Sequence, residues 1–130
     1  MPTILSAAFG EGNRLFTEFK GALTENFVLQ SLVTQFEVVP RYWTQNNPPY
    51  EVDFLIQREN DIFPVEVKSD TNTTSKSLKK FKELFPDKVK LRVRFSLDNL
   101  KLDNDVLNIP LFMTDEAERL IGLAIERQKN

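Results

Sequence analysis

Apolar residues in the first third of the chain recur at helical spacing. Over residues 13–36 they form two stripes with a period near 3.6 residues, which predicts one long helix. Two stripes indicate a helix that is buried on more than one side. One stripe is Ala22, Leu29, Leu32, Val33 and Phe36, and the other is Phe16, Phe19, Leu23 and Phe27.

The middle of the chain alternates between short apolar runs and turn-forming residues. Residues 37–44, 50–57 and 62–69 are predicted strands, with QNNPP as a turn and RENDI as a hairpin connection. A polar loop, DTNTTS, follows. Ser75 is expected to cap a helix that continues to Phe85 and ends before Pro86.

The last third predicts two more strands and a helix. Residues 88–95 alternate basic and apolar side chains, as a half-exposed strand does, and VLNIPLFMT predicts another strand. Thr114 is expected to cap a final helix with acidic residues in its first turn. The order α-β-β-β-α-β-β-α predicts an α/β fold with a mixed central sheet flanked by helices.

Composition supports one soluble domain over residues 1–130. A hydrophobic fraction of 41% and eleven Phe are enough for a core. No apolar run is long enough to cross a bilayer, and the N-terminus lacks the pattern of a secretory signal. We therefore expect a cytoplasmic protein that does not associate with membranes.

The chain contains no Cys and no His. This excludes disulfides, zinc–thiolate sites, histidine metal sites and Ser-His triads. Any catalysis must use carboxylates, Lys, Tyr or Ser/Thr. A metal site would have oxygen ligands and would suit Mg²⁺ or Mn²⁺.

Charge is distributed unevenly along the chain. Residues 76–94 are mostly basic and residues 98–118 mostly acidic. A basic face can bind phosphates even in an acidic protein. The alternative is a solvated face next to an edge strand guarded by lysines. The candidate nucleic-acid-binding residues are Lys76, Lys79, Lys80, Arg92 and Arg94.

Charged residues also interrupt the apolar strands. Glu66 and Lys68 lie two residues apart and therefore project from the same face of their strand, about 7 Å apart. If the strands predicted over residues 50–57 and 62–69 pair as a hairpin, Asp53 of the first comes close to Glu66 of the second, on one face. Two nearby carboxylates repel each other unless a cation lies between them, and a divalent metal would remove that repulsion.

A third carboxylate, Glu25, falls on an apolar stripe of the first helix. A buried carboxylate without a partner is costly, so Glu25 needs a hydrogen-bond donor, a Lys or a metal. The simplest alternative is a structural ion pair with Lys68 or Arg41.

These residues suit phosphodiester cleavage. A metal neutralises the phosphate and lowers the pKa of an attacking water. Asp53 and Glu66 would hold the metal, Glu25 would hold a second metal or its water shell, and Lys68 would orient the water or stabilise charge developing on the phosphate.

Glu on a helix, Asp on a strand and Glu-x-Lys on the next strand resemble the PD-(D/E)XK nuclease superfamily. The resemblance implies a restriction-endonuclease-like α-β-β-β-α-β core and marks Glu25, Asp53, Glu66 and Lys68 as site residues, with Mg²⁺ or Mn²⁺ as cofactor. FKGALTENFVLQSL, YW, EVDFLI and PVEVKS also resemble the uncharacterised C-terminal domain of bacterial and archaeal AAA ATPases, over about residues 15–112. The chain has no Gly-x-x-x-x-Gly-Lys-Ser/Thr loop, so it cannot hydrolyse ATP by that route. The resemblance implies a fragment of a longer ATPase-linked protein.

Three hypotheses follow. The first is a Mg²⁺-dependent nuclease that acts on nucleic acid, with DNA as the expected substrate. The second is a catalytically silent module of the same fold that binds nucleic acid or protein and is attached to an AAA ATPase. The third is a dimerisation domain, which would make the protein a homodimer.

Overall fold

The computed structural model describes residues 11–46, 49–69 and 76–129, and side chains within residues 19–40, 52–69 and 76–129. The elements, in chain order, are helix α2 (Glu11–Leu32), strands β1 (Glu37–Asn46), β2 (Pro49–Arg58) and β3 (Asp61–Val67), helix α3 (Lys76–Leu84), strands β4 (Arg92–Ser96), β5 (Lys101–Asp103) and β6 (Val106–Pro110), the 3-10 helix η1 (Leu111–Glu116) and helix α4 (Ala117–Lys129).

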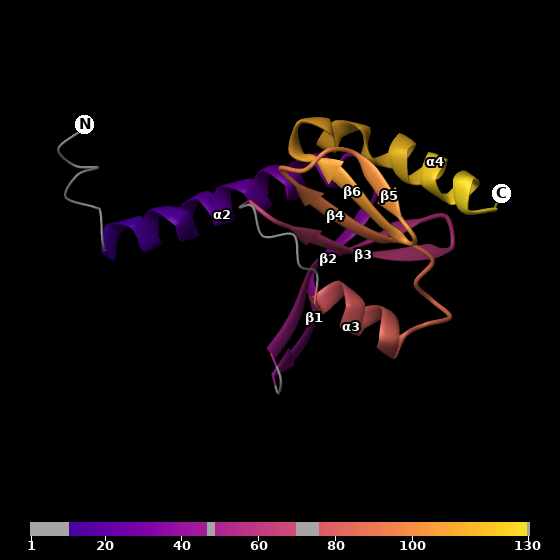
Figure 1. Cartoon of the computed structure of the whole chain (residues 1–130), viewed down its shortest axis with the longest axis horizontal. Helices are drawn as coiled ribbons and strands as arrows, with labels where there is room; N and C mark the ends of the chain where they lie inside the picture. Colours follow the sequence, from indigo (N-terminus) through magenta and orange to yellow (C-terminus); the bar gives the residue numbers. More distant parts are fainter. Residues whose placement is uncertain (1–10, 47–48, 70–75, 130) are drawn as a thin grey trace.

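The strands form one mixed sheet in the order β1-β2-β3-β4-β6-β5. Strands β1, β2 and β3 pair antiparallel, β4 lies parallel to both β3 and β6, and β5 pairs antiparallel with β6. Helices α3 and α4 lie on opposite sides of this sheet (Figure 1). The predicted α/β fold with a mixed sheet, flanking helices and an additional C-terminal helix is therefore confirmed.

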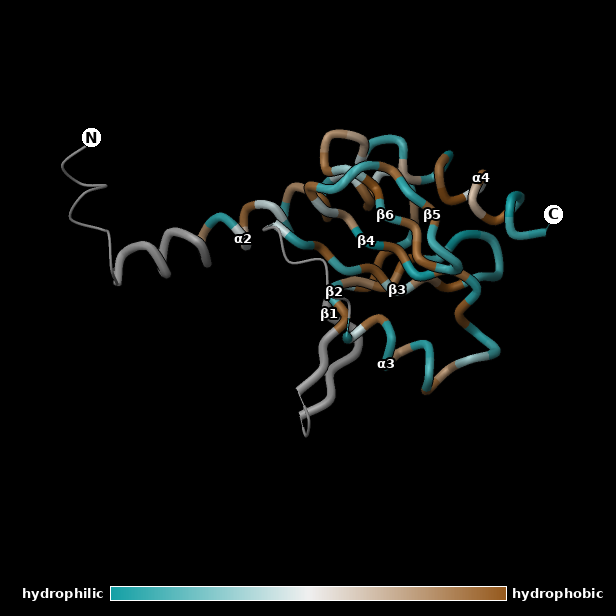
Figure 2. Tube along the Cα trace, viewed as in Figure 1, coloured by the Kyte–Doolittle hydropathy of each residue, from teal (hydrophilic) through white to brown (hydrophobic). Residues whose placement is uncertain are grey.

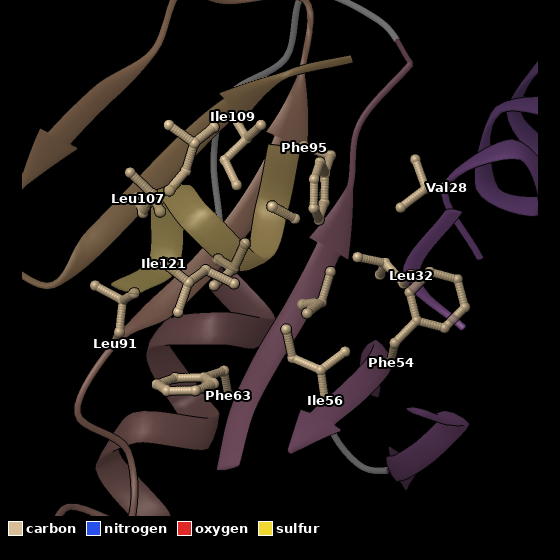
Figure 3. Packing of buried hydrophobic residues seen from close by; sticks show 14 of the residues in the cluster. Val28, Leu32, Phe54, Ile56, Phe63, Leu91, Phe95, Leu107, Ile109 and Ile121 are labelled. Atoms are coloured by element: carbon tan, nitrogen blue, oxygen red, sulfur yellow. The ribbon is translucent and has the colours of Figure 1, made fainter. Parts of the chain in front are cut away.

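The main core lies between the sheet and helices α2 and α4. Alternate residues of β2, β3, β4 and β6 contribute to it, and Leu32 of α2 lies beside Phe54 of β2 (Figure 3). A smaller cluster under α3 consists of Val52, Leu55, Phe81 and Val89. Figure 2 shows hydrophobic residues along the central strands and hydrophilic residues at the turns. The two faces of the sheet are thus covered unequally.

Helix α2 is buried on one side only, which corrects the two-stripe prediction. Val28 and Leu32 are fully buried, whereas Phe19, Leu23 and Phe27 are 62%, 55% and 55% exposed. The reason is geometric, because the N-terminal part of α2 extends away from the sheet (Figure 1).

Strand boundaries after α3 differ from the prediction. β4 begins at Arg92 rather than at residue 88, although Val89 and Leu91 before it are buried. β5 was not predicted. It pairs with β6 through a turn at Asn104, whose φ is 55°. The β2–β3 turn is also shorter than RENDI, with Glu59 at φ 57°.

The predicted strand VLNIPLFMT divides into β6 and η1 after Pro110. Thr114 does not cap the last helix, because its hydroxyl donates to the carbonyl of Leu111 within η1. Instead Gln35, just after α2, accepts the backbone N–H of Glu118 with its Oε1 (2.9 Å) and donates to the carbonyl of Thr114 (3.0 Å). Gln35, which is distant in sequence, therefore supplies the hydrogen-bond acceptor for a backbone N–H in the first turn of α4. The predicted cap Ser75 lies outside the described residues.

Candidate functional site

The face of the sheet away from the main core carries polar side chains. Core residues alternate along each strand with residues that face the other way. Glu66 of β3 is in register with Arg94 of β4, which is in register with Asn108 of β6, and Asn108 pairs with Lys101 of β5. These four residues form a polar row across four adjacent strands.

Glu66 is the acidic residue of this row, and it is buried. It is 8% exposed, and its Oε1 lies 3.2 Å from Lys68 Nζ. Its Oε2 is buried and has no hydrogen-bond partner. The predicted shared face of Glu66 and Lys68 is confirmed by this contact. Burying a carboxylate oxygen without a hydrogen-bond donor or a cation costs folding free energy, so Oε2 needs a further partner.

Asp53 lies on β2 at the level of Glu66. The β2–β3 pairing ends at Phe54 and Val65, and Asp53 precedes Phe54. Its Oδ2 accepts a hydrogen bond from the backbone N–H of Val67 (2.8 Å), the residue that follows Glu66. The hairpin therefore brings Asp53 to the carboxyl end of β3, beside Glu66, as the sequence predicts.

Glu25 lies on the side of α2 that faces the carboxyl end of β3. Gly21, one turn earlier, is close enough to Ser69 that an added Cβ would lie 3.6 Å from Ser69 Oγ. Val28, three residues after Glu25, is buried in the core. Residues three or four apart share a helix face, so half-buried Glu25 lies on this side. The side chain of Arg41, one predicted partner of Glu25, lies outside the described side chains.

Two carboxylates, rather than three, are the donors that fit a metal here. Among the described residues, no group of three or more acidic side chains could hold a metal ion together. Glu25 as a further ligand stays a prediction. Mg²⁺ is commonly held by one or two carboxylates, with water and substrate phosphate as its other ligands. The bare Oε2 of Glu66, with Asp53 on the neighbouring strand, fits that pattern.

The predicted basic residues fall into two groups. Lys76 and Lys79 are exposed on α3, and Lys80 is half-buried there. Arg92 and Arg94 lie on β4, which is an internal strand, so the alternative of a lysine-guarded edge strand is wrong.

Arg92 forms an ion pair with Asp105, which lies in the acidic stretch that follows it in sequence. Its Nη2 lies 2.6 Å from Asp105 Oδ1, and Lys82 Nζ lies 3.5 Å from Asp105 Oδ2. Burial alone would raise the pKa of Asp105, but the hydrogen bond and charge of Arg92, with the charge of Lys82, lower it below its ordinary value. Arg92 therefore has a structural ion pair on this face.

Sequence analysis missed Asn108. It is 3% exposed, and its Oδ1 accepts from Arg94 Nε (2.9 Å) and from the hydroxyl of Ser96 (2.6 Å). The available signal was a lone Asn inside the apolar run VLNIP.

The protein-family model for a domain of unknown function, DUF4143, matches residues 20–112. This match covers more than half of the chain. The chain belongs to the DUF4143 family. DUF4143 domains occur in the C-terminal regions of AAA ATPases, which agrees with part of the resemblance seen in the sequence.

The DUF4143 match includes Glu25, Asp53, Glu66 and Lys68, together with all six strands. No curated protein and no solved structure gives a significant match to this chain. Within the described part of the chain, no helix is long and apolar enough to cross a membrane.

Proposed function

We propose that this DUF4143 domain is a divalent-metal-dependent nuclease of the PD-(D/E)XK type that hydrolyses phosphodiester bonds, with DNA as its expected substrate. The observation that carries the proposal is the buried, unpartnered Oε2 of Glu66 on β3, with Lys68 just after the end of that strand and Asp53 on the adjacent strand β2. A purely structural Glu66–Lys68 ion pair gives no reason to bury that second oxygen without a donor.

Each residue has a defined role in the proposal. Asp53 and Glu66 would hold Mg²⁺ or Mn²⁺, and Glu25, on the face of α2 nearest the end of β3, would order the metal's water shell or a second ion. When bound, the metal would neutralise the phosphate and acidify its water. Lys68 would orient that water or stabilise negative charge on the phosphate oxygens.

The lysines of α3 would bind the nucleic-acid backbone. α3 packs against the face of the sheet that carries Leu55, and Glu66 projects from that same face. The exposed Lys76 and Lys79 therefore lie on the same side of the sheet as the candidate site. Lysine contacts to phosphate are independent of sequence and weaken as salt rises.

The test is a cleavage assay with Mn²⁺ or Mg²⁺ on supercoiled, linear and single-stranded DNA and on RNA. The wild-type domain should cut at least one of these, and EDTA or Glu66→Gln should abolish cutting. Glu83→Gln, the same change at an exposed position on α3, is the matched control and should cut normally. A wild-type protein that cuts none of these substrates with either metal contradicts the proposal.

A second candidate is a catalytically silent DUF4143 module that binds nucleic acid or protein beside an ATPase. Two contacts favour it. Glu66 Oε1 already pairs with Lys68, and Asp53 Oδ2 already accepts the N–H of Val67. Under this alternative, nucleic acid binds equally well with EDTA and in Glu66→Gln, without cleavage.

A further inference from the structure

The exposed side of α2 carries a line of large apolar side chains. Phe19, Leu23 and Phe27 are 62%, 55% and 55% exposed. They follow one another at intervals of four residues, so they lie along one side of the helix. These three residues form the α2 stripe. A contiguous line of exposed apolar side chains marks an interaction surface, whereas a single exposed one does not.

The α2 stripe points away from the protein's own core. Nine residues make two and a half helical turns, so residues nine apart lie on opposite sides of a helix. Phe19 is nine residues before Val28, and Leu23 is nine residues before Leu32. Val28 and Leu32 are fully buried in the main core. The sheet therefore cannot cover the α2 stripe while α2 keeps its own contact with the core.

The α2 stripe is symmetric about its middle residue. Its pattern, Phe-x-x-x-Leu-x-x-x-Phe, reads the same in both directions. If two copies of α2 pack antiparallel about a two-fold axis at Leu23, each Leu23 contacts the other. Each Phe19 then faces Phe27 of the partner subunit. A two-fold interface requires a surface of this kind, which is complementary to itself.

The residues beside the α2 stripe favour the antiparallel arrangement. Lys20, Ala22, Asn26 and Gln30 are exposed there, and Lys20 is the charged residue among these four. About an axis at Leu23, Lys20 lies at the level of Asn26 of the partner subunit. A parallel pair in register would instead bring the two Lys20 ammonium groups to the same level, where like charges repel each other.

The area of the α2 stripe indicates how strong the association is. Since a fully exposed Phe side chain presents about 200 Å², the stripe offers roughly 300 Å² per chain. Two chains would bury about 600 Å² from the stripe, and the polar side chains beside it would add to this area. Interfaces that bury less than about 1,200 Å² in total belong to weak complexes. The expected dimer is therefore one that depends on protein concentration.

We propose that the α2 stripe is the interface of a homodimer in which two copies of α2 pack antiparallel about Leu23. The area predicts a Kd on the order of 10–100 µM. The inference is independent of the proposed nuclease activity, because Val28 and Leu32, on the opposite side of α2 from the stripe, face the sheet that carries the candidate site.

The first experiment uses disulfide trapping, for which the chain is suited because it contains no Cys. At about 100 µM, Leu23→Cys should form a covalent dimer on mild oxidation. Phe19→Cys and Phe27→Cys should each stay monomeric alone, because like positions lie about 12 Å apart along the antiparallel pair. Their equimolar mixture should form a covalent dimer. Leu123→Cys, on α4 and 56% exposed, is the matched control and should stay monomeric.

The second experiment measures mass by light scattering from about 5 to 500 µM protein. The wild-type mass should rise from that of one chain towards that of two. Leu23→Glu should raise the Kd by about 100-fold or more, because each carboxylate would be buried against its symmetry mate. Leu123→Glu, the same change at an equally exposed leucine, should dimerise as wild type does.

A wild-type protein that stays monomeric up to 500 µM overturns the inference. A dimer that persists unchanged in Leu23→Glu uses another surface and overturns it too. Efficient trapping of Phe19→Cys alone, without trapping in the mixture with Phe27→Cys, contradicts the antiparallel arrangement. The cysteine variants keep the proposal testable if circular dichroism shows that Leu23→Glu is unfolded.

Discussion

Asp53 on β2 accepts the backbone N–H of Val67 on β3, with 2.8 Å between Oδ2 and N. The contact begins where the regular pairing of these strands ends, at Phe54 and Val65. A side chain thus replaces a backbone carbonyl as acceptor and fixes the end of β3, which carries Glu66 and is followed directly by Lys68. Asp53 therefore has a structural role at the end of β3 in addition to its proposed role in the metal site.

Two substitutions separate the roles of Asp53. Asp53→Asn keeps an acceptor for Val67 but removes the charge, so it should lower Mn²⁺ affinity and cleavage with little loss of stability. Asp53→Ala leaves the Val67 N–H without its acceptor and should lower the free energy of unfolding by about 1–3 kcal/mol. Urea unfolding and Mn²⁺ titration measure the two effects. Equal metal affinity in wild type and Asp53→Asn would remove Asp53 from the metal site.

Removing the Lys68 ammonium should separate metal binding from catalysis. In Lys68→Met, Glu66 loses the ammonium group with which it pairs. Because that positive charge no longer repels the metal, Mn²⁺ should bind at least as tightly as in wild type. Cleavage should fall by about 10²-fold or more, because the charge that stabilises the phosphate oxygens is gone. Parallel titration and rate measurements test this. Weaker Mn²⁺ binding in Lys68→Met would contradict the assigned role.

Acid stability should depend on Asp105. Its carboxyl has a lowered pKa in the folded chain, so the unfolded chain takes up a proton first as pH falls. The stabilisation is complete above the ordinary value of 3.8 and is lost as pH falls through the lower folded value. Thermal melts from pH 7 to 2 should show a shallower acid dependence for Asp105→Asn.

The control for that series is Asp103→Asn, a neighbouring exposed Asp on β5. Its acid profile should follow wild type. If Asp103→Asn and Asp105→Asn give the same profile, the Arg92–Asp105 pair is not the source of the acid sensitivity.

Gly21 should tolerate alanine. The added Cβ would lie 3.6 Å from Ser69 Oγ, an ordinary contact. Since glycine in a helix interior costs about 0.5–1 kcal/mol relative to alanine, Gly21→Ala should raise the free energy of unfolding by about that amount. Gly122→Ala should gain less, because its Cβ would lie 2.9 Å from Arg58 Nη2. A net loss of stability in Gly21→Ala by urea unfolding would contradict the packing of α2 against β3.

The element order apart from β5 and η1, and the charged pair at the end of β3, could be predicted because alternation and helical spacing are local signals. Glu66 and Lys68 share a face simply because they are two residues apart on a strand. The exposure of Phe19, Leu23 and Phe27 could not be predicted, since it depends on how far α2 extends past the sheet. The pairing of Arg92 with Asp105 and the hold of Asn108 on Arg94 depend on the order β4-β6-β5, which the sequence pattern does not reveal.

The most direct test of the metal site is diffraction from crystals soaked in Mn²⁺, recorded where manganese scatters anomalously. We expect an anomalous peak within ligand distance of Glu66 Oε2 and the Asp53 carboxylate, absent from matched Glu66→Gln crystals. Wild-type crystals with no such peak, and with Glu66 still paired only with Lys68, would contradict a metal-dependent nuclease site.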